Sequence, residues 1–224
     1  MQKKAIILFS GGLDSTTCLA IAKAQDFQCY TLSFNYGQKH SVEVEHAKRL
    51  ADFYGVAEHK ILSLPIGDLA GSSLTDKKLA VADYNGSSDI PSTYVPARNT
   101  IFLSFALAWA EVLDAADIII GANHVDYSGY PDCRPDYLQA FEQVAKLATK
   151  RGREGVIFTI HAPLLNMNKA EIIQQGLQLG VDYSKTISCY RADDKGRACG
   201  SCDSCVFRKK GFKEANTEDP TVYA

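Results

Sequence analysis

Short apolar runs of strand length alternate with helical stretches along most of this 224-residue chain. Strands that alternate with helices are typical of a parallel sheet whose two faces are both covered. The runs that predict strands cover residues 4–9, 27–34, 58–62, 117–122 and 156–162. We therefore predict an α/β fold with a doubly wound parallel sheet, followed by a small carboxy-terminal subdomain.

The helices are predicted from apolar faces and from residues that start or end a helix. Apolar residues at helical spacing predict helices at about residues 15–24, 44–54, 100–113 and 135–150. Asn168 and Glu171 have the spacing of a capping box, which starts a helix that Gly180 ends. Residues 67–99 are rich in glycine and serine, so we expect a long loop there, and such loops often carry function.

The composition excludes several classes of protein. Hydrophobic residues make up 46% and charged residues 22% of the chain, which is enough for a core and excludes wholesale disorder. The 24 basic and 26 acidic residues give a net charge of -2, unlike the strongly basic balance of a nonspecific nucleic-acid binder. The apolar runs are shorter than the ~20 residues that span a bilayer, and the first one stops at Ser10, too early for a secretory signal. We expect a cytoplasmic protein with no membrane or nucleic-acid partner.

A glycine-rich motif lies between the first predicted strand and the first predicted helix. It reads Ser-Gly-Gly-Leu-Asp-Ser and covers residues 10–15. Glycines let backbone N–H groups turn toward an anion, the helix amino terminus adds positive potential, and serine hydroxyls can donate to phosphate oxygens. The alternative is a tight strand-to-helix turn in which Asp14 only caps the helix. A Walker P-loop is excluded, because no Gly-Lys pair followed by Ser or Thr occurs in the sequence.

Four of the seven cysteines are grouped near the end of the chain, which favours metal binding over a disulfide framework. They are Cys189, Cys199, Cys202 and Cys205. Four thiolates can form a tetrahedron around Zn²⁺, and four protein ligands leave no position for a catalytic water, so the zinc would be structural. An iron–sulfur cluster also takes four cysteines, and reduced free thiols are a further alternative.

Polar and aromatic side chains follow the second and the fourth predicted strand. Both clusters lie beyond the carboxyl ends of strands, where open α/β sheets bind ligands. Such side chains suit a flat heterocycle that forms hydrogen bonds, whereas the alternative is that these Gly-, Pro- and Asp-containing stretches are only loops. The candidate substrate-binding residues in the two clusters are Phe34, Tyr36, Gln38, His40, Asp126, Ser128, Tyr130 and Asp132.

The glycine-rich motif resembles the PP-loop of the ATP pyrophosphatase superfamily, whose members adenylate a carbonyl or carboxyl oxygen and release pyrophosphate. With the two polar clusters, residues 95–99 and the terminal cysteines, the chain resembles the 7-cyano-7-deazaguanine synthase family over residues 9–208. The resemblance implies an adenine nucleotide alpha hydrolase-like fold, with a nucleotide-binding catalytic domain at residues 1–182 and a zinc-binding segment at residues 183–224. It also implies ATP-dependent conversion of 7-carboxy-7-deazaguanine and ammonia to the 7-cyano product in queuosine biosynthesis, by a homodimer that uses Mg²⁺ and one structural Zn²⁺.

The resemblance gives the zinc ligands and the ATP loop, and the chemistry that it implies suggests roles for the other residues. The zinc ligands would be the four grouped cysteines, and Ser10 and Ser15 would hold phosphates whose charge Mg²⁺ offsets. Asp14 would be catalytic, and Arg98 would stabilise negative charge, with a surface ion pair as its alternative. Asn99 would bind substrate beside Arg98. The residues predicted to bind ATP are Phe9, Ser10, Gly11, Gly12, Leu13, Asp14, Ser15, Thr16, Thr17, Cys18 and Leu19.

Two other functions use some of the same features. One keeps the PP-loop but makes a tRNA base the substrate, although the chain offers little added RNA-binding surface and no excess of basic residues. The other is a zinc ribbon that binds nucleic acid, with a basic edge on a terminal helix formed by Arg208, Lys209, Lys210 and Lys213. For those four charges a solvated helix face is the more common explanation.

Overall fold

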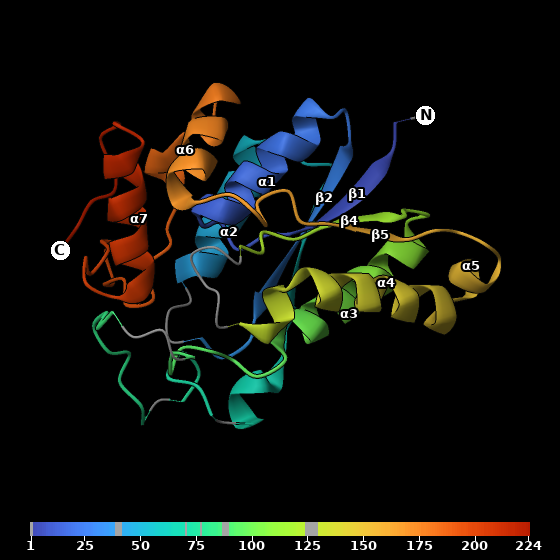
Figure 1. The fold of residues 1–224 in the computed structure, drawn as a ribbon, viewed down its shortest axis with the longest axis horizontal. Coiled ribbons are helices and arrows are strands. Elements are labelled where there is room, and N and C mark those ends of the chain that lie inside the picture. The colour runs from blue at the N-terminus through green and yellow to red at the C-terminus, as the bar shows by residue number, and fades with distance from the viewer. Residues whose placement is uncertain (1, 39–41, 70, 77, 87–89, 124–129) are drawn as a thin grey trace.

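The computed structural model describes residues 2–38, 42–69, 71–76, 78–86, 90–123 and 130–224, and its core is one parallel sheet (Figure 1). The strand order is β3-β2-β1-β4-β5. Their bounds are β1 Lys4–Leu8, β2 Gln28–Asn35, β3 Glu58–Ser63, β4 Asp117–Ile119 and β5 Thr159–His161. Every pairing is parallel, and Ile6 of β1 lies opposite Tyr30 of β2 and Ile118 of β4. The predicted doubly wound parallel sheet is therefore confirmed.

The helices cover both faces of the sheet (Figure 1). Their bounds are α1 Leu13–Ala24, α2 Val42–Phe53, α3 Arg98–Val112, α4 Pro135–Ala148, α5 Lys150–Arg153, α6 Lys169–Gln178 and α7 Asp203–Glu214. Short 3₁₀ turns lie at Pro65–Leu69, Pro131–Cys133 and Tyr183–Lys185. Two hydrophobic clusters separate the faces: one contains apolar residues of α1, α2, α6 and α7, and the other contains those of α3 and α4.

Strand β1 is the central strand, and its side chains alternate between the two hydrophobic clusters. Ala5 and Ile7 pack with the α1 side, whereas Ile6 and Leu8 pack with the α3 side. Ile6 and Ile7 are fully buried, and burying such a side chain stabilises a fold by about 1.5–3 kcal/mol. The chain winds outward in opposite directions from β1 and β4, and the carboxyl ends of strands at such a switch point leave a crevice for ligands.

Several element boundaries differ from the predicted ones. β5 is shorter than the predicted 156–162 strand, and Ile157 before it is 82% exposed. The predicted 135–150 helix is divided at Thr149, whose Oγ1 accepts a hydrogen bond from Gly152 N–H at 2.9 Å and caps α5. The capping box of Asn168 and Glu171 is confirmed at the start of α6.

The carboxy-terminal helix α7 packs beside α6, and Phe212 joins the core on the α1 side (Figure 1). Arg208 is only 3% exposed: its guanidinium pairs with Asp219 at 3.1 Å and donates to the carbonyl of Tyr183 at 3.0 Å. Placing Arg208 on a basic, solvated edge of this helix was therefore wrong, because its side chain points inward. Lys209, Lys210 and Lys213 are exposed. Among the residues described, the helices are too short or too polar to cross a membrane.

Candidate active site

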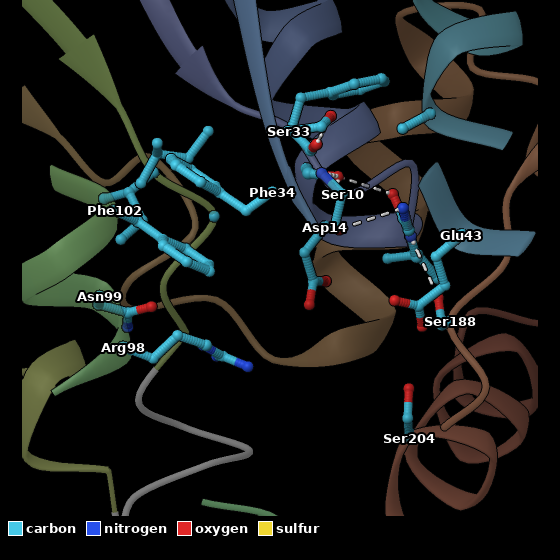
Figure 2. Close-up of a pocket in the computed structure, with 18 of the residues that line it drawn as sticks. Ser10, Asp14, Ser33, Phe34, Glu43, Arg98, Asn99, Phe102, Ser188 and Ser204 are labelled. Atoms are coloured by element: carbon cyan, nitrogen blue, oxygen red, sulfur yellow. Dashed lines mark hydrogen bonds between the residues drawn. The ribbon is translucent and has the colours of Figure 1, made fainter. Parts of the chain in front are cut away.

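A cavity of about 270 Å³ opens at the carboxyl ends of β1, β2 and β4 (Figure 2). One end is lined by the glycine-rich loop and the start of α1, and we call it the phosphate end. The other end is lined by aromatic and polar side chains from β2, α3 and the segment that starts at Tyr130, and we call it the base end. The sheet topology thus brings the sequence-predicted motifs together in one cavity.

The backbone of the phosphate end requires glycine. Gly11 has φ +76°, and a Cβ there would lie 3.0 Å from the Cα of Ala47 in α2. Gly12 is the N-cap residue of α1, so the amino terminus of this helix faces the cavity. Free N–H groups and the helix dipole make such a terminus a site for phosphate.

Serine hydroxyls hold this loop in shape. Ser15 Oγ accepts a hydrogen bond from Ser10 N–H at 3.2 Å, and Ser10 Oγ accepts one from Gly12 N–H at 3.3 Å. Ser188 Oγ, from a segment far along the chain, accepts one from Leu13 N–H at 3.2 Å. The loop is therefore ordered by neutral hydroxyls that can also donate to phosphate oxygens.

Asp14 lies at the phosphate end and faces a lysine. Both of its carboxylate oxygens accept from Lys169 Nζ, at 2.8 and 2.9 Å. Asp14 does not cap α1, because Gly12 is the N-cap residue and no side chain bonds to it there. The side chain of Lys169 is 8% exposed and that of Asp14 is 27% exposed, so the carboxylate remains open to the cavity.

The four grouped cysteines come together behind the phosphate end. Their Sγ atoms all lie within 4.8 Å of one another, and three of the four residues are buried. Hydrogen bonds from Cys189 and Cys205 hold the pKa of the Cys202 thiol far below its ordinary value, so this sulfur is a ready thiolate. Thiolates are the form that binds metals, so the donor set fits a metal with four protein ligands.

The segment before Cys189 contacts the glycine-rich loop directly. Ile187 N–H donates to the carbonyl of Gly11 at 3.3 Å, next to the contact between Ser188 and Leu13. On its other side, Arg191 donates to Ser201 Oγ at 2.7 Å and to the carbonyl of Val81 at 3.0 Å in the long loop. The cysteine cluster therefore lies between two loops and supports both.

Aromatic rings form one wall of the base end. Phe34 and Phe102 are stacked, with ring centroids 4.0 Å apart and planes 6° apart, and Tyr36 meets Phe102 edge-on at 5.5 Å. The amide of Gln38 accepts from Tyr36 N–H at 2.7 Å and donates to the carbonyl of Phe34 at 3.1 Å. Gln38 thereby fixes the turn that follows β2.

Arg98 and Asn99 begin α3 and reach the cavity from its other side. Figure 2 shows the Arg98 guanidinium and the Asp14 carboxylate pointing into the same space from opposite walls. Burial lowers the pKa of Arg98, but Tyr36, Tyr190, Tyr130 and Asp132 around it raise the pKa by more, so the guanidinium stays charged. A surface ion pair, the alternative for Arg98, does not describe this position.

Comparison with known proteins identifies the family. The family model described as Queuosine biosynthesis protein QueC matches residues 4–216. The chain is 62% identical over 222 residues to the 7-cyano-7-deazaguanine synthase of Coxiella burnetii, covering 99% of this chain and 98% of the relative. It is 61% identical to that of Nitrosococcus oceani, covering 98% of each chain. This chain belongs to the 7-cyano-7-deazaguanine synthase family.

Solved structures with a similar fold are far more distant in sequence. A 4-thiouridine synthetase bound to RNA and ATP has TM-score 0.55 and 19% identity, covering 99% of this chain and 47% of that chain. NMN synthetase from Francisella tularensis has TM-score 0.52 and 16% identity, covering 97% of this chain and 78% of that chain. These likenesses support the α/β fold of this 7-cyano-7-deazaguanine synthase family member.

The predicted site residues lie in four kinds of place. Those that line the cavity are Phe9, Ser10, Gly12, Leu13, Asp14 and Ser15 of the loop and Phe34, Tyr36, Gln38, Arg98, Asn99 and Tyr130 of the base end. Gly11 and Asp132 do not line it: Gly11 lies within the loop, and Asp132 accepts a hydrogen bond from Asn99 N–H. Thr16, Thr17, Cys18 and Leu19 are fully buried in α1 and support the loop from behind. Burial raises the pKa of Cys18 well above its usual value, so its thiol is neutral. Three predicted residues lie outside the described residues: His40, Asp126 and Ser128.

Sequence reasoning about the 7-cyano-7-deazaguanine synthase motifs missed Glu43, which lines the cavity from the first turn of α2. Burial raises the pKa of Glu43 to about 7, although Arg98 lowers it. A carboxyl group in the first turn of a helix that follows a polar cluster is a signal that could have drawn attention to it. Ser188 and Tyr190 were also missed, and only the folded chain brings them to the cavity.

Proposed function

We propose that this protein is an ATP-dependent ligase that converts 7-carboxy-7-deazaguanine and ammonia to 7-cyano-7-deazaguanine in queuosine biosynthesis. The observation that carries the proposal is the identity of 60–62%, over nearly the whole chain, to enzymes named 7-cyano-7-deazaguanine synthase. The cavity supports it, because the glycine-rich loop and the amino terminus of α1 at one end suit phosphates and the other end presents stacked aromatic rings.

The reaction needs two activations. In the first, a carboxylate oxygen attacks the α-phosphorus of ATP and pyrophosphate leaves. Ammonia then attacks the acyl carbon, AMP leaves with the former carboxylate oxygen, and a proton is lost to give the amide. In the second, the amide oxygen attacks another ATP in the same way, and loss of AMP and of the nitrogen-bound protons yields the nitrile. One phosphate-binding loop serves both activations in this scheme.

The phosphate end supplies electrostatic stabilisation of the developing charge. The loop amides, Ser10 and Ser15 hold phosphate oxygens in this proposal. The Asp14 carboxylate would hold Mg²⁺, which supplies a Lewis acid that neutralises charge on the leaving pyrophosphate. Lys169, paired with Asp14, lies where its ammonium can contact the same phosphates.

Arg98 and Glu43 both line the cavity, and the charge of Arg98 lowers the pKa of Glu43. We expect the Arg98 guanidinium to stabilise negative charge on the activated intermediate. Glu43, with its pKa near neutrality, suits the acceptance of a proton as ammonia adds. Arg98→Glu should abolish turnover while the metal content is retained, and retained turnover would remove Arg98 from the mechanism.

The metal is proposed to be one structural Zn²⁺ held by the four cysteines. Four thiolate ligands leave the ion no open position, so it orders the neighbouring loops and takes no part in the chemistry. Elemental analysis of the purified protein should give about one zinc per chain. Iron with sulfide in its place would identify a cluster instead.

We further propose a cytoplasmic homodimer that binds no nucleic acid. Exposed apolar side chains on α3 and α4, which include Phe105, Val112, Val144 and Leu147, would be covered by a second copy. Sedimentation should therefore give twice the mass of the 24.5 kDa chain. Electrophoretic mobility of tRNA should be unchanged by the protein at low salt, where charge-driven binding is strongest.

The deciding experiment is an incubation with ATP, Mg²⁺, ammonium and 7-carboxy-7-deazaguanine, with bases and nucleotides resolved by mass spectrometry. A base with the nitrile mass that requires both ATP and ammonium establishes the reaction, and AMP with pyrophosphate identifies adenylation. Accumulation of the amide alone would remove the second activation from this protein. No change in base or ATP, with metal bound and fold intact, would contradict the proposed function.

A further inference from the structure

Three hydrogen bonds from two neighbouring residues fix Asn99 at the base end of the cavity. Its backbone N–H donates to Asp132 Oδ2 at 3.0 Å, and its amide Nδ2 donates to the backbone carbonyl of Asp132 at 3.1 Å and to Cys133 Sγ at 3.3 Å. A backbone carbonyl can only accept, so the amide atom that faces it must be the nitrogen. The orientation of the Asn99 amide is therefore determined by its partners.

This orientation leaves the amide oxygen of Asn99 for a ligand. Both amide N–H groups are occupied, and among the described residues no hydrogen bond reaches Oδ1. Figure 2 shows the oxygen turned toward the interior of the cavity. Asn99 is only 6% exposed, so a ligand that fills the cavity displaces water from this oxygen. A buried acceptor left without a donor costs about 1–3 kcal/mol.

The position of Asn99 selects the edge of the base that it meets. The carboxylate on C7 must approach ATP at the phosphate end, and Figure 2 places Asn99 across the cavity from Ser10. In 7-carboxy-7-deazaguanine the atoms farthest from C7 are those of the pyrimidine edge, where N1–H and the 2-amino group both donate. The Asn99 amide, which offers an oxygen acceptor and no free N–H, matches this donor edge. It disfavours a base whose corresponding edge presents only acceptors.

We propose that Asn99 Oδ1 is a specificity-determining acceptor that reads the 2-amino and N1–H edge of the base, and that Asp132 is the positioning residue that aims it. This inference rests on the proposed function and adds the contact that selects a guanine-type base. Asp132 acts through Asn99, because its carboxylate and its carbonyl both hold that residue. Asp132 is 6% exposed and belongs to the short turn Pro131–Cys133 before α4.

The test compares two substrates, 7-carboxy-7-deazaguanine and the hypoxanthine-type analogue that lacks the 2-amino group. For the wild-type enzyme we expect kcat/KM to be about 10–100-fold lower with the analogue, because Oδ1 loses a donor. Asn99→Ala should lose about the same factor with the natural base and little more with the analogue, so the discrimination disappears. The KM for ATP should not change in either case.

The role of Asp132 is tested by the discrimination between the two bases, which loss of a residue that only stabilises the fold would not change. Asp132→Ala should reduce the discrimination between the two bases, whereas Asp132→Asn, which keeps an acceptor for the Asn99 N–H, should restore it. A general loss of stability would instead lower kcat/KM for both bases by the same factor. Thermal melting of each variant identifies that case.

Three results would overturn the inference. They are equal kcat/KM for the two bases in the wild type, unchanged discrimination in folded Asn99→Ala, and equal discrimination in both Asp132 variants. If Asn99→Ala does not fold, Asn99→Ser, which offers a shorter acceptor, should show reduced discrimination. If the wild type turns over neither base, the proposed function fails, and calorimetric binding of the two bases still decides the contact.

Discussion

The two ends of the cavity are built in different ways. The phosphate end is centred on one contiguous stretch of backbone, residues 10–15, whose shape depends on glycine, on hydroxyls within the stretch and on contacts from Ile187 and Ser188. The base end is assembled from side chains of β2, α3 and the turn Pro131–Cys133, which meet only in the folded chain. We therefore expect a change in the phosphate end to disturb the whole loop, whereas the base end can be altered one contact at a time.

The sharpest test of this contrast is Gly11→Ala. The added Cβ would meet the backbone of Ala47 at 3.0 Å in a conformation with φ +76°, so the loop must move. A misplacement of about 1 Å at a site of chemistry can lower the rate by about 100-fold, so we expect turnover to fall by about that factor. Gly55→Ala is the matched control, because Gly55 also has positive φ, at +60°, but a Cβ there meets nothing within 4 Å. ATP binding by each variant is measured by calorimetry. Equal loss of binding in Gly11→Ala and Gly55→Ala would contradict the role of the loop in binding ATP.

The next largest effect is expected from Cys202→Ser. Removing one of four thiolates should release the metal, loosen Ile187 and Ser188 and so weaken the phosphate end from behind. We expect turnover to fall about 30-fold or more, with a higher KM for ATP. Cys29→Ser, at a buried thiol away from the cavity, should keep both metal and turnover. An unchanged KM for ATP in metal-free protein would show that the two regions are independent.

A smaller and more selective effect is expected at the base end. Phe102→Leu removes a ring from the stacked pair, and stacking on a base contributes about 1–3 kcal/mol. The KM for the deazaguanine should rise about tenfold while the KM for ATP stays the same. Phe53→Leu, at a ring that is 59% exposed on α2, is the control. A parallel rise in both KM values would mean that the two ends do not act separately.

The last effect is on stability rather than on turnover, and it is expected at Glu43 in the first turn of α2. Its pKa in the folded protein is about 7, above the ordinary 4.5, so the folded state holds this proton more tightly than the unfolded state does. Its contribution to stability is therefore present at low pH and is lost as pH rises through 7. Relative to wild type, Glu43→Gln should gain about 2–3 kcal/mol in the free energy of unfolding between pH 5 and pH 8. Urea titrations at both pH values measure it, and a constant difference would assign Glu43 an ordinary pKa.

The contrast between the two ends also explains what the sequence could predict. The sheet, the glycine-rich loop and the cysteine cluster are local patterns, and the sequence predicted all three, although β4 and β5 are shorter than expected. Asp14 and Lys169 are 155 positions apart, so no local spacing reveals their pairing. The sequence placed Arg208 on the surface because charged side chains on helices are usually solvated. Its partners, Asp219 and the carbonyl of Tyr183, are distant from the helix pattern and are known only from the fold.

Base-end contacts were the hardest to predict, because neighbouring polar residues in a motif need not share a role. Gln38 and Asp132 were both expected to touch substrate, yet each forms hydrogen bonds that fix a neighbouring residue. Whether they also touch the base stays a prediction. Glu43 and Ser188 enter the cavity through the packing of α2 and of the segment before Cys189, which helix or strand patterns do not encode.

Hydrogen bonds join Ile187 and Ser188 to the glycine-rich loop, so the proposed binding of nucleotide and the proposed binding of metal would be coupled. If an ordered cysteine segment favours nucleotide binding, then bound nucleotide must favour metal binding by the same factor. An enzyme at work on ATP would then hold its metal more firmly than an idle one. When metal is scarce, protein molecules without bound nucleotide would lose the ion first. The concentration of ATP would then determine what fraction of the molecules keeps an ordered cysteine segment.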